Sequence, residues 1–290
     1  MKSVFDIPLL SKKTKSVIGL QINDKVIRLL ELGRDKRLIG SPIEADAEGK
    51  DKASLLKELV QSYGLHGKAV SACVPVNDGL LKFYKYPTAM SRKDLMSAIE
   101  WSIKRELSAM KEETYYDYFV LEPRPEDKQL GVVLVLSRKE TVENLRGIIE
   151  SAGLKLHTLD YEVVAIVNYG LYHRLPIPFT ILYVDYSYSI LVTYSPTNLN
   201  YYVTYWSYKG FLKSGDEESL ESFFAEIRNI VVLNDLSSMY VAGPILMEEE
   251  MLTKIMENLP ILGLLDLEGV KPNFFIPYIP YILSIRGMEE

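Results

Sequence analysis

Cysteine and histidine are scarce in this chain of 290 residues, and their scarcity excludes several chemistries. The single cysteine, Cys73, cannot form an internal disulfide. It lies in the apolar run VSACVPV, which predicts a small buried side chain rather than a reactive thiol. The three histidines, His66, His157 and His173, are far apart and lack the spacing of metal ligands. Because no Gly-x-Ser-x-Gly, Gly-Lys-Thr or paired-cysteine motif occurs either, we expect no catalytic constellation.

Long apolar runs and clustered positive charge are also missing. No apolar run approaches the roughly 20 residues of a membrane-spanning helix, and the N-terminal VFDIPLL is too short for a signal peptide, so we expect a cytoplasmic protein. The net charge of −6 and the pI near 5.4 argue against nucleic acid as the main partner. We expect a solvated leader over residues 1–15, with contact to anionic lipid as the alternative, because it contains Lys2, Lys12, Lys13 and Lys15.

The most informative stretch runs from Ser16 to Leu32 and reads SVIGLQINDKVIRLLEL. Two apolar strand patterns flank Asn23-Asp24, and both residues tolerate the positive φ of a tight two-residue turn. The sequence therefore predicts a β-hairpin with its tip at this pair. The stretch resembles the opening of actin-like proteins of the PilM family, a component of type IV pilus assembly, whose usual form is close to GIDIGSSSVKVVEL. The residues that fit this form are Gly19, Ile22, Arg28 (for Lys), Glu31 and Leu32.

Further strand and helix patterns follow along the chain. In order, we predict a strand over 37–45, a helix over 51–63, strands over 68–76 and 80–86, a helix opened by Ser91, strands over 115–122 and 130–136, helices over 141–152 and 159–172, a hairpin of 179–193 with 200–205, a helix over 217–233, a strand over 239–242, and helices over 248–257 and from about 280. Asp94 follows Ser91 by three residues, which is a capping-box arrangement. The hairpin pattern occurs twice, as expected of a duplicated fold.

The segment of residues 78–155 carries the strongest resemblance. It matches, in order and spacing, the inserted subdomain of PilM-like proteins at Tyr86-Pro87, Met90-Ser91, Leu95, Ile99-Glu100-Trp101, Tyr116-Asp117-Tyr118, VVLVLSRKE and ESAGLKL. The resemblance implies an α/β protein with a two-domain, actin-like (ribonuclease H-like) fold. Its expected parts are a first domain of residues 1–77 with 156–177, an inserted α+β partner-binding subdomain of residues 78–155, and a reduced second domain of residues 178–290.

The resemblance also indicates where a nucleotide would bind, because actin-like enzymes hold the phosphates of ATP between two hairpin tips. Glycine lets backbone N–H groups approach the phosphates there, and an acidic residue holds Mg²⁺. At the first tip of this chain, Gln21 replaces the acid and Asn23 replaces the glycine. At the second tip Asp185 is retained but Ser187 stands between two tyrosines, and at a third turn Gly243 precedes a proline, which lacks an N–H.

These five positions are therefore expected to be a degenerate nucleotide motif. Between the second hairpin and the strand over 239–242 we expect a single helix, where family members carry a further small subdomain that helps to enclose the nucleotide. Both observations predict a protein without a cofactor and without ATP hydrolysis, and they disfavour bound ATP and Mg²⁺.

A surface for a partner protein is the function that remains, and the helix opened by Ser91 provides a candidate. At 100° per residue its apolar side chains share one arc, which is expected to be buried: Leu95, Met96, Ile99, Ile103 and Leu107. Trp101 falls near the opposite side with Arg105 beside it, and this is the composition of a binding hot spot. The other interpretation is that Trp101 packs under a neighbouring loop of the same chain. Tyr84 and Tyr86, on the preceding strand, complete the candidate partner-binding residues.

In PilM-like proteins a short cytoplasmic peptide of the inner-membrane partner PilN binds between the first domain and the inserted subdomain. The resemblance implies the same here: a cytoplasmic scaffold of a type IV pilus or related secretion platform, peripheral at the inner membrane and not an enzyme. It also implies contacts with other pilus platform or motor subunits and leaves self-association open. The alternatives are a working actin-like ATPase with an atypical site, and the cytoplasmic part of a type II secretion platform, whose family usually carries a membrane span after its actin-like part.

Overall fold

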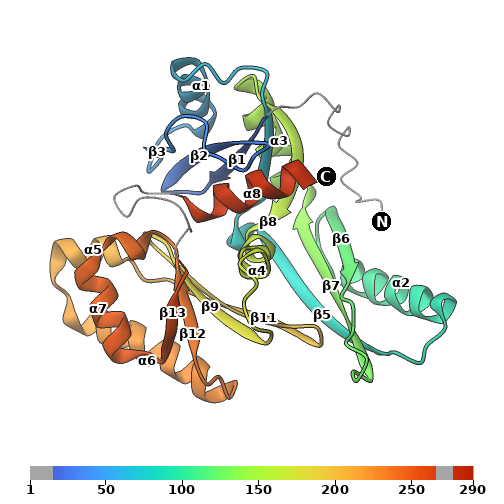
Figure 1. The fold of residues 1–290 in the computed structure, drawn as a ribbon. Coiled ribbons are helices and arrows are strands. Elements are labelled where there is room, and N and C mark those ends of the chain that lie inside the picture. The colour runs from blue at the N-terminus through green and yellow to red at the C-terminus, as the bar shows by residue number, and fades with distance from the viewer. Residues whose placement is uncertain (1–15, 266–276, 290) are drawn as a thin grey trace.

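Three β-sheets organise the chain in the computed structural model, which describes residues 16–265 and 277–289 (Figure 1). The first sheet has the strand order β3-β2-β1-β4-β8. Its strands are β1 (Ser16–Ile22), β2 (Val26–Gly33), β3 (Ile43–Asp46), β4 (Ala69–Val74) and β8 (Lys155–Tyr161). The first three strands form an antiparallel meander, and β4 and β8 continue the sheet in parallel from β1.

The second sheet repeats this arrangement strand for strand. It has the order β11-β10-β9-β12-β13. Its strands are β9 (Phe179–Val184), β10 (Ser189–Ser195), β11 (Asn198–Thr204), β12 (Met239–Ala242) and β13 (Ile261–Leu264). Three antiparallel strands are again followed by two parallel strands beside the first strand of the meander. The predicted duplication is therefore confirmed, and the hairpin β1–β2 corresponds to the hairpin β9–β10.

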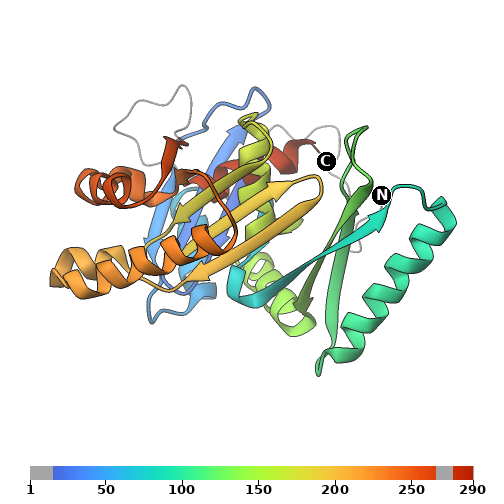
Figure 2. The same cartoon turned by 90° about the horizontal axis from the view of Figure 1, so that it is seen from below.

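The third sheet is smaller and extends to one side of the other two. It contains β5 (Gly79–Pro87), β7 (Gln129–Arg138) and β6 (Thr114–Val120) in this order, all antiparallel. The helix α2 (Arg92–Ala109) covers the face of this sheet that is turned away from the rest of the molecule (Figure 2). A separate small core fills the space between helix and sheet, and its buried residues include Ile99, Ile103, Val132 and Leu134.

The remaining helices cover the two large sheets. They are α1 (Lys52–Ser62), α3 (Lys139–Ser151), α4 (Glu162–Tyr172), α5 (Tyr208–Ser214), α6 (Glu217–Leu233), α7 (Glu249–Asn258) and α8 (Tyr278–Glu289), with two 3₁₀ turns, η1 (Val76–Asp78) and η2 (Pro244–Met247). The helix α4 contacts both large sheets, and one continuous core joins its Val163 and Ile166 to Ile181 of β9. Within residues 16–265 and 277–289, none of the helices has the length and apolarity that crossing a membrane requires.

Two helices pack against a different part of the fold from the one to which the predicted division of the chain assigns them. The helix α3 falls within 78–155, but its Val142 and Leu145 join the core of the first half together with Leu56 of α1. The helix α8 falls within 178–290, but it lies along β1, β2 and β4 of the first sheet. The part of the insertion with its own core is therefore limited to β5, α2, β6 and β7.

The tip of the first hairpin also differs from the prediction. The Asn23 N–H donates to the carbonyl of Val26, so the two residues at the tip are Asp24 and Lys25. The Oδ1 atom of Asn23 accepts from the N–H groups of Lys25 and Val26, both over 2.9 Å. The expectation of positive φ at Asn23 and Asp24 is wrong, because the described non-glycine residues with positive φ lie elsewhere. The side chain of Asn23, rather than a left-handed backbone, holds this turn.

Most of the other predicted elements are confirmed within a few residues, including the Ser91 cap of α2 and the start of α8 close to Pro280. Four expectations are wrong. Residues 155–161 form β8 and residues 261–264 form β13, where we predicted no strands. Residues 179–193 turn at Asp185 and make two strands, β9 and β10, and two helices, α5 and α6, lie between β11 and β12 instead of one. The predicted leader of residues 1–15 lies outside the described residues.

Candidate functional site

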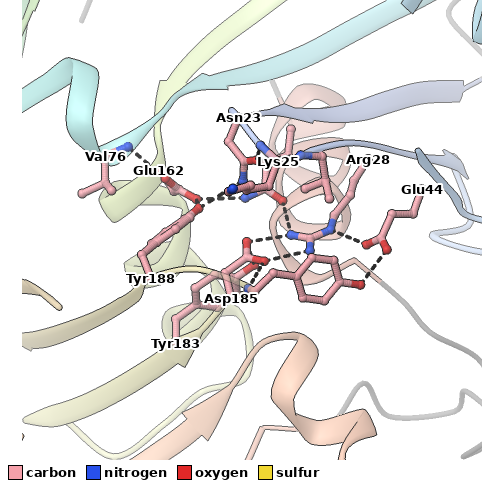
Figure 3. Close-up of polar contacts among 12 residues, drawn as sticks. Asn23, Lys25, Arg28, Glu44, Val76, Glu162, Tyr183, Asp185 and Tyr188 are labelled. Carbon is pink, nitrogen blue, oxygen red and sulfur yellow. Dashed lines mark hydrogen bonds and ion pairs between the residues drawn. The ribbon is translucent and has the colours of Figure 1, made fainter. Parts of the chain in front are cut away.

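The two equivalent hairpin tips meet between the two halves of the molecule (Figure 3). One is the β1–β2 tip that follows Gln21, and the other is the β9–β10 turn, where the Asp185 N–H donates to the carbonyl of Tyr188. The structure thus brings Gln21, Asn23 and Asp185 close together, and Ser187 is half-buried in the second turn.

Arg28 of β2 occupies the space between the two tips. Its side chain has no exposed surface, and its terminal nitrogens donate to both carboxylate oxygens of Asp185, over 2.7 Å (Nη1 to Oδ2) and 2.8 Å (Nη2 to Oδ1). The Nη1 atom also donates to Oε1 of Gln21 over 3.0 Å, and Nε donates to Oε2 of Glu44 on β3 over 2.7 Å. A cation of the first half therefore holds an anion of the second half in a bidentate, charge-assisted pair.

Tyr186 covers this ion pair. The centre of its ring lies 4.6 Å from Cζ of Arg28, and its hydroxyl donates to Oε1 of Glu44 over 2.6 Å. Its backbone N–H donates to Oδ1 of Asp185 over 2.7 Å, and the Nζ atom of Lys209 lies 3.3 Å from the centre of the same ring. The ring therefore stabilises the guanidinium through its π-face and orients the Glu44 carboxylate through its hydroxyl.

A second polar cluster lies beside the first and is centred on Glu162, the first residue of α4. Its Oε1 atom accepts from Nε2 of Gln21 over 2.9 Å and from the hydroxyl of Tyr188 over 2.5 Å. Its Oε2 atom accepts from the backbone N–H of Val76 over 2.9 Å. The amide of Gln21 joins the two clusters, because it donates to Glu162 and accepts from Arg28.

Burial and ion pairing change the pKa values of these groups in different directions. Burial raises the pKa of Glu162 to about 7, although the hydrogen bonds from Tyr188 and Val76 favour its ionised form. Burial also opposes the ionisation of Asp185, but Arg28 outweighs it and lowers the pKa of this carboxyl. Burial likewise opposes the charge of Arg28, and Asp185 outweighs it and raises the pKa of the guanidinium. Asp185 is thus charged at neutral pH, whereas Glu162 titrates close to neutral pH.

The residues at these tips do not fit ATP with Mg²⁺. Both carboxylate oxygens of Asp185 are bonded to Arg28, so neither is free to hold a hydrated cation. Glu44 and an ionised Glu162 add negative charge that repels phosphate groups. Among the residues that the structure describes, no group of three or more His, Cys, Asp or Glu side chains is arranged to hold a metal ion.

Gly243, at the third predicted motif position, has a role in packing. Its φ is +101°, and a Cβ atom built on it would lie 2.6 Å from the carbonyl oxygen of Val184 on β9. Glycine is therefore required for the close approach of the end of β12 to β9. Pro244 follows as the first residue of η2 and offers no N–H to a ligand.

The predicted partner-binding residues lie away from the polar network of the hairpin tips, around α2. Trp101 is 62% exposed on the helix, so it does not pack under a described loop of its own chain. Cζ of Arg105 lies 5.0 Å from the centre of the Trp101 ring. Tyr84 and Tyr86 are half-buried between β5 and α2 and contact the small core there. Met96, which we placed on the buried arc, is exposed.

Five residues of this polar network were missed by the sequence analysis as site residues: Arg28, Glu44, Glu162, Tyr186 and Tyr188. Arg28 had a usable signal, because a cation inside the apolar run VIRLLEL needs a buried partner. Glu162 had a weaker one, as a carboxylate directly before the apolar run VVAIV. The parts played by Glu44 and Tyr188 depend on contacts with distant strands and had no local signal.

Comparisons with known proteins agree with this architecture. A family model for the type IV pilus assembly protein PilM matches residues 20–177. The solved structure of a PilM-PilN type IV pilus biogenesis complex is similar with a TM-score of 0.76, 16% identity, and coverage of 94% of this chain and 99% of that chain. No curated protein sequence matches the chain significantly.

Two further solved structures share the fold at lower similarity. A Bacteroides thetaiotaomicron protein with an actin-like ATPase fold and unknown function has a TM-score of 0.54 at 9% identity, with 94% of this chain and 97% of that chain covered. The cytoplasmic domain of EpsL, an inner membrane component of the type II secretion system of Vibrio cholerae, has a TM-score of 0.54 at 10% identity, with 95% of each chain covered. The predicted actin-like fold is therefore confirmed.

Proposed function

Because this chain belongs to the PilM family of type IV pilus assembly proteins, we propose that it is a cytoplasmic scaffold that docks the cytoplasmic tail of a PilN-like inner-membrane protein and does not hydrolyse ATP. Docking would hold the protein at the inner face of the membrane. From there it would contact other subunits of the pilus platform.

The observation that carries the non-hydrolytic part of this proposal is the Arg28–Asp185 ion pair. In actin-like enzymes a nucleotide lies between the two hairpin tips and joins the two halves. Here the buried guanidinium of Arg28 lies between the tips and bonds to Asp185 of the other half. The chain's own side chains therefore supply the connection that a bound nucleotide would otherwise supply.

The docking part of the proposal uses the face of the third sheet opposite to α2. On this face Phe83, Phe119 and Val135 pack toward the core of the first half, yet each is only partly buried. Gly131 lies between Phe83 and the Pro196 carbonyl of the β10–β11 turn, since a Cβ atom on it would lie within 2.7 Å of both. We propose that this partly open apolar face of Phe83, Phe119 and Val135, called the groove below, holds an extended apolar peptide.

A nucleotide titration tests the first part. We expect ATP with Mg²⁺, up to several millimolar, to leave the midpoint of thermal unfolding unchanged, because binding to the folded state alone would raise it. The matched measurement is ATP without Mg²⁺ in the same buffer. A saturable stabilisation at sub-millimolar ATP would overturn the proposal and favour a working ATP-binding protein with an atypical site.

A peptide titration tests the second part. The probe is a synthetic peptide with the N-terminal sequence of the membrane protein encoded beside this chain's gene. We expect saturable binding that Phe83→Ala weakens by about tenfold or more, as for an anchor residue. Trp101→Ala, on the far side of the same subdomain, is the matched variant. Equal weakening by both variants would place the peptide outside the groove, and absence of binding would remove the docking proposal.

The similarity to the cytoplasmic domain of EpsL supports a second candidate, a component of a type II secretion platform. The two candidates differ in the membrane partner. The same titration with the cytoplasmic peptide of a type II platform protein separates them, because only the cognate peptide should bind with a dissociation constant in the micromolar range.

A further inference from the structure

The outer face of α2 carries an exposed tryptophan in a fixed polar setting. Trp101 stands near the middle of this face, and Lys93, Ser97, Lys104 and Arg105 are exposed around it. We call these five residues the α2 outer surface. It is turned away from the two large sheets (Figure 2), so it is separate from the groove on the opposite side of the third sheet.

The guanidinium of Arg105 is held in place on this surface. It lies between two aromatic rings, 5.0 Å from the centre of Trp101 and 5.7 Å from the centre of Tyr84. Its Nη2 atom donates to Oε1 of Glu106 over 3.2 Å, and the same oxygen accepts from the Tyr84 hydroxyl over 2.7 Å. About half of the Arg105 side chain remains exposed. A cation that is already oriented loses little entropy when an anion binds to it.

The charges around Trp101 indicate the chemistry of the ligand. Lys93 and Lys104 lie on the same face as Arg105, in a chain whose net charge is −6. Two nearby carboxylates are engaged locally, since Asp94 bonds to Ser91 at the helix start and Glu106 bonds to Tyr84. Glu100 is exposed at the edge of the face. The surface therefore combines an apolar anchor with positive charge, and it fits a carboxylate next to an apolar side chain.

We propose that the α2 outer surface is a second docking site, which binds an acidic segment of a partner protein while the groove holds another ligand. This goes beyond the proposed function, because the two surfaces lie on opposite sides of the third sheet. A flat anionic membrane is a poorer fit, since the large exposed apolar side chains of α2 are limited to Met96 and Trp101, and Glu100 would face the lipid phosphates.

The test uses the fluorescence of Trp101 in the full chain. The other tryptophan, Trp206, is buried against Phe223 and is replaced in a Trp206→Phe background, so that the emission reports Trp101 alone. The probe is a peptide with two glutamates on either side of a phenylalanine, and its control carries glutamine at each glutamate. We expect a saturable blue shift with the acidic peptide, with a dissociation constant below about 1 mM, and none with the glutamine peptide.

Two arginine variants make the test specific. In the same background Arg105→Ala should weaken binding of the acidic peptide by about tenfold or more. Arg228→Ala, which removes a half-buried arginine of α6 far from this surface, should not change the binding. Equal binding of the glutamine peptide, no binding of the acidic peptide, or equal loss with both variants would overturn the proposal. The protein could instead bind no peptide but sediment with phosphatidylglycerol vesicles, and lose this sedimentation in Trp101→Ala. That result would also overturn the proposal and would assign the surface to the membrane.

Failure of this proposal is distinguishable from failure of the groove proposal. Arg105→Ala should leave binding of the PilN-like peptide unchanged, because that peptide is expected on the other face of the sheet. If Arg105→Ala weakens the binding of both peptides to the same degree, the two surfaces are one site and the second docking site does not exist.

Discussion

The backbone N–H of Val76 donates a hydrogen bond to Oε2 of Glu162 over 2.9 Å. Val76 begins η1, the turn that leads from the first sheet into the third, and Glu162 belongs to the polar network between the hairpin tips. The Tyr161 hydroxyl donates to the carbonyls of Val76 and Gly79 on the same connection. The polar network between the two hairpin tips is therefore bonded directly to the stem of the inserted sheet.

The first prediction concerns the pH dependence of stability. Burial raises the pKa of Glu162 from 4.5 to about 7. For a group whose pKa is raised on folding, its contribution to stability is fully present below pH 4.5 and is lost as the pH rises through 7. We expect Glu162→Gln to remove this loss. Wild type should therefore lose stability between pH 5 and 8 while the variant does not. The difference in the free energy of unfolding, variant minus wild type, should increase over this range by on the order of 3 kcal/mol at most.

Urea unfolding at several pH values measures this difference. Glu140→Gln is the matched control, because Glu140 is an exposed glutamate in the first turn of α3. We expect its pH profile to run parallel to that of wild type. If Glu162→Gln also runs parallel to wild type, Glu162 does not titrate near neutral pH in the folded protein.

The second prediction concerns the ion pair between the two halves. Arg28→Met leaves Asp185 charged and buried without its bidentate partner, which should lower the free energy of unfolding by about 3 to 5 kcal/mol. Asp185→Asn removes the charge but keeps an oxygen that can accept from the Tyr186 N–H. We expect the double variant to be more stable than Arg28→Met alone, because it contains no unpaired buried charge at this position.

A double-mutant cycle with urea unfolding yields the coupling energy of the pair. Arg37→Ala is the surface control, since Arg37 and its partner Asp35 are exposed, and it should change stability by less than about 1 kcal/mol. Additive effects of Arg28→Met and Asp185→Asn would mean that the pair does not connect the two halves energetically.

Local patterns were sufficient to predict most of the elements. The spacing of Leu220, Phe223, Phe224 and Ile227 predicted α6 with its observed bounds, because one amphipathic face packs on one sheet. The strand β8 was missed because LKLHTLDY has neither clear alternation nor a continuous apolar run, and it is stabilised by parallel pairing with β4. Parallel partners lie far away in sequence and leave no short-range signal.

The sequence placed Gln21 and Asn23 at the first hairpin tip and Asp185 at the second, and whether these positions form a degenerate nucleotide motif stays a prediction. What fills the tip could not be predicted, because Arg28 and Asp185 are 157 residues apart and neither has a local partner pattern. The place of α8 could not be predicted for the same reason. The strands β9 to β13 form the second sheet, but α8, which follows them in the chain, packs on the first sheet.

The third prediction concerns Gly19, a residue of the hairpin that fits the family pattern. A Cβ atom built on Gly19 would lie 1.6 Å from the carbonyl oxygen of Pro280 in α8. Gly19 is thus needed for the close packing of the C-terminal helix on β1, and not for a phosphate. We expect Gly19→Ala to displace α8 and to lower the free energy of unfolding by about 3 kcal/mol or more, at the upper end of the overpacking range.

Thermal unfolding and hydrogen exchange of α8 together measure the effect of Gly19→Ala. Gly147→Ala is the matched control, because Gly147 lies within α3 and a Cβ atom there would have no neighbour within 4 Å. In this exposed helical position alanine should stabilise the protein by about 0.5 to 1 kcal/mol. Unchanged stability and unchanged exchange of α8 in Gly19→Ala would contradict the packing role, because α8 could then move away from β1 without cost.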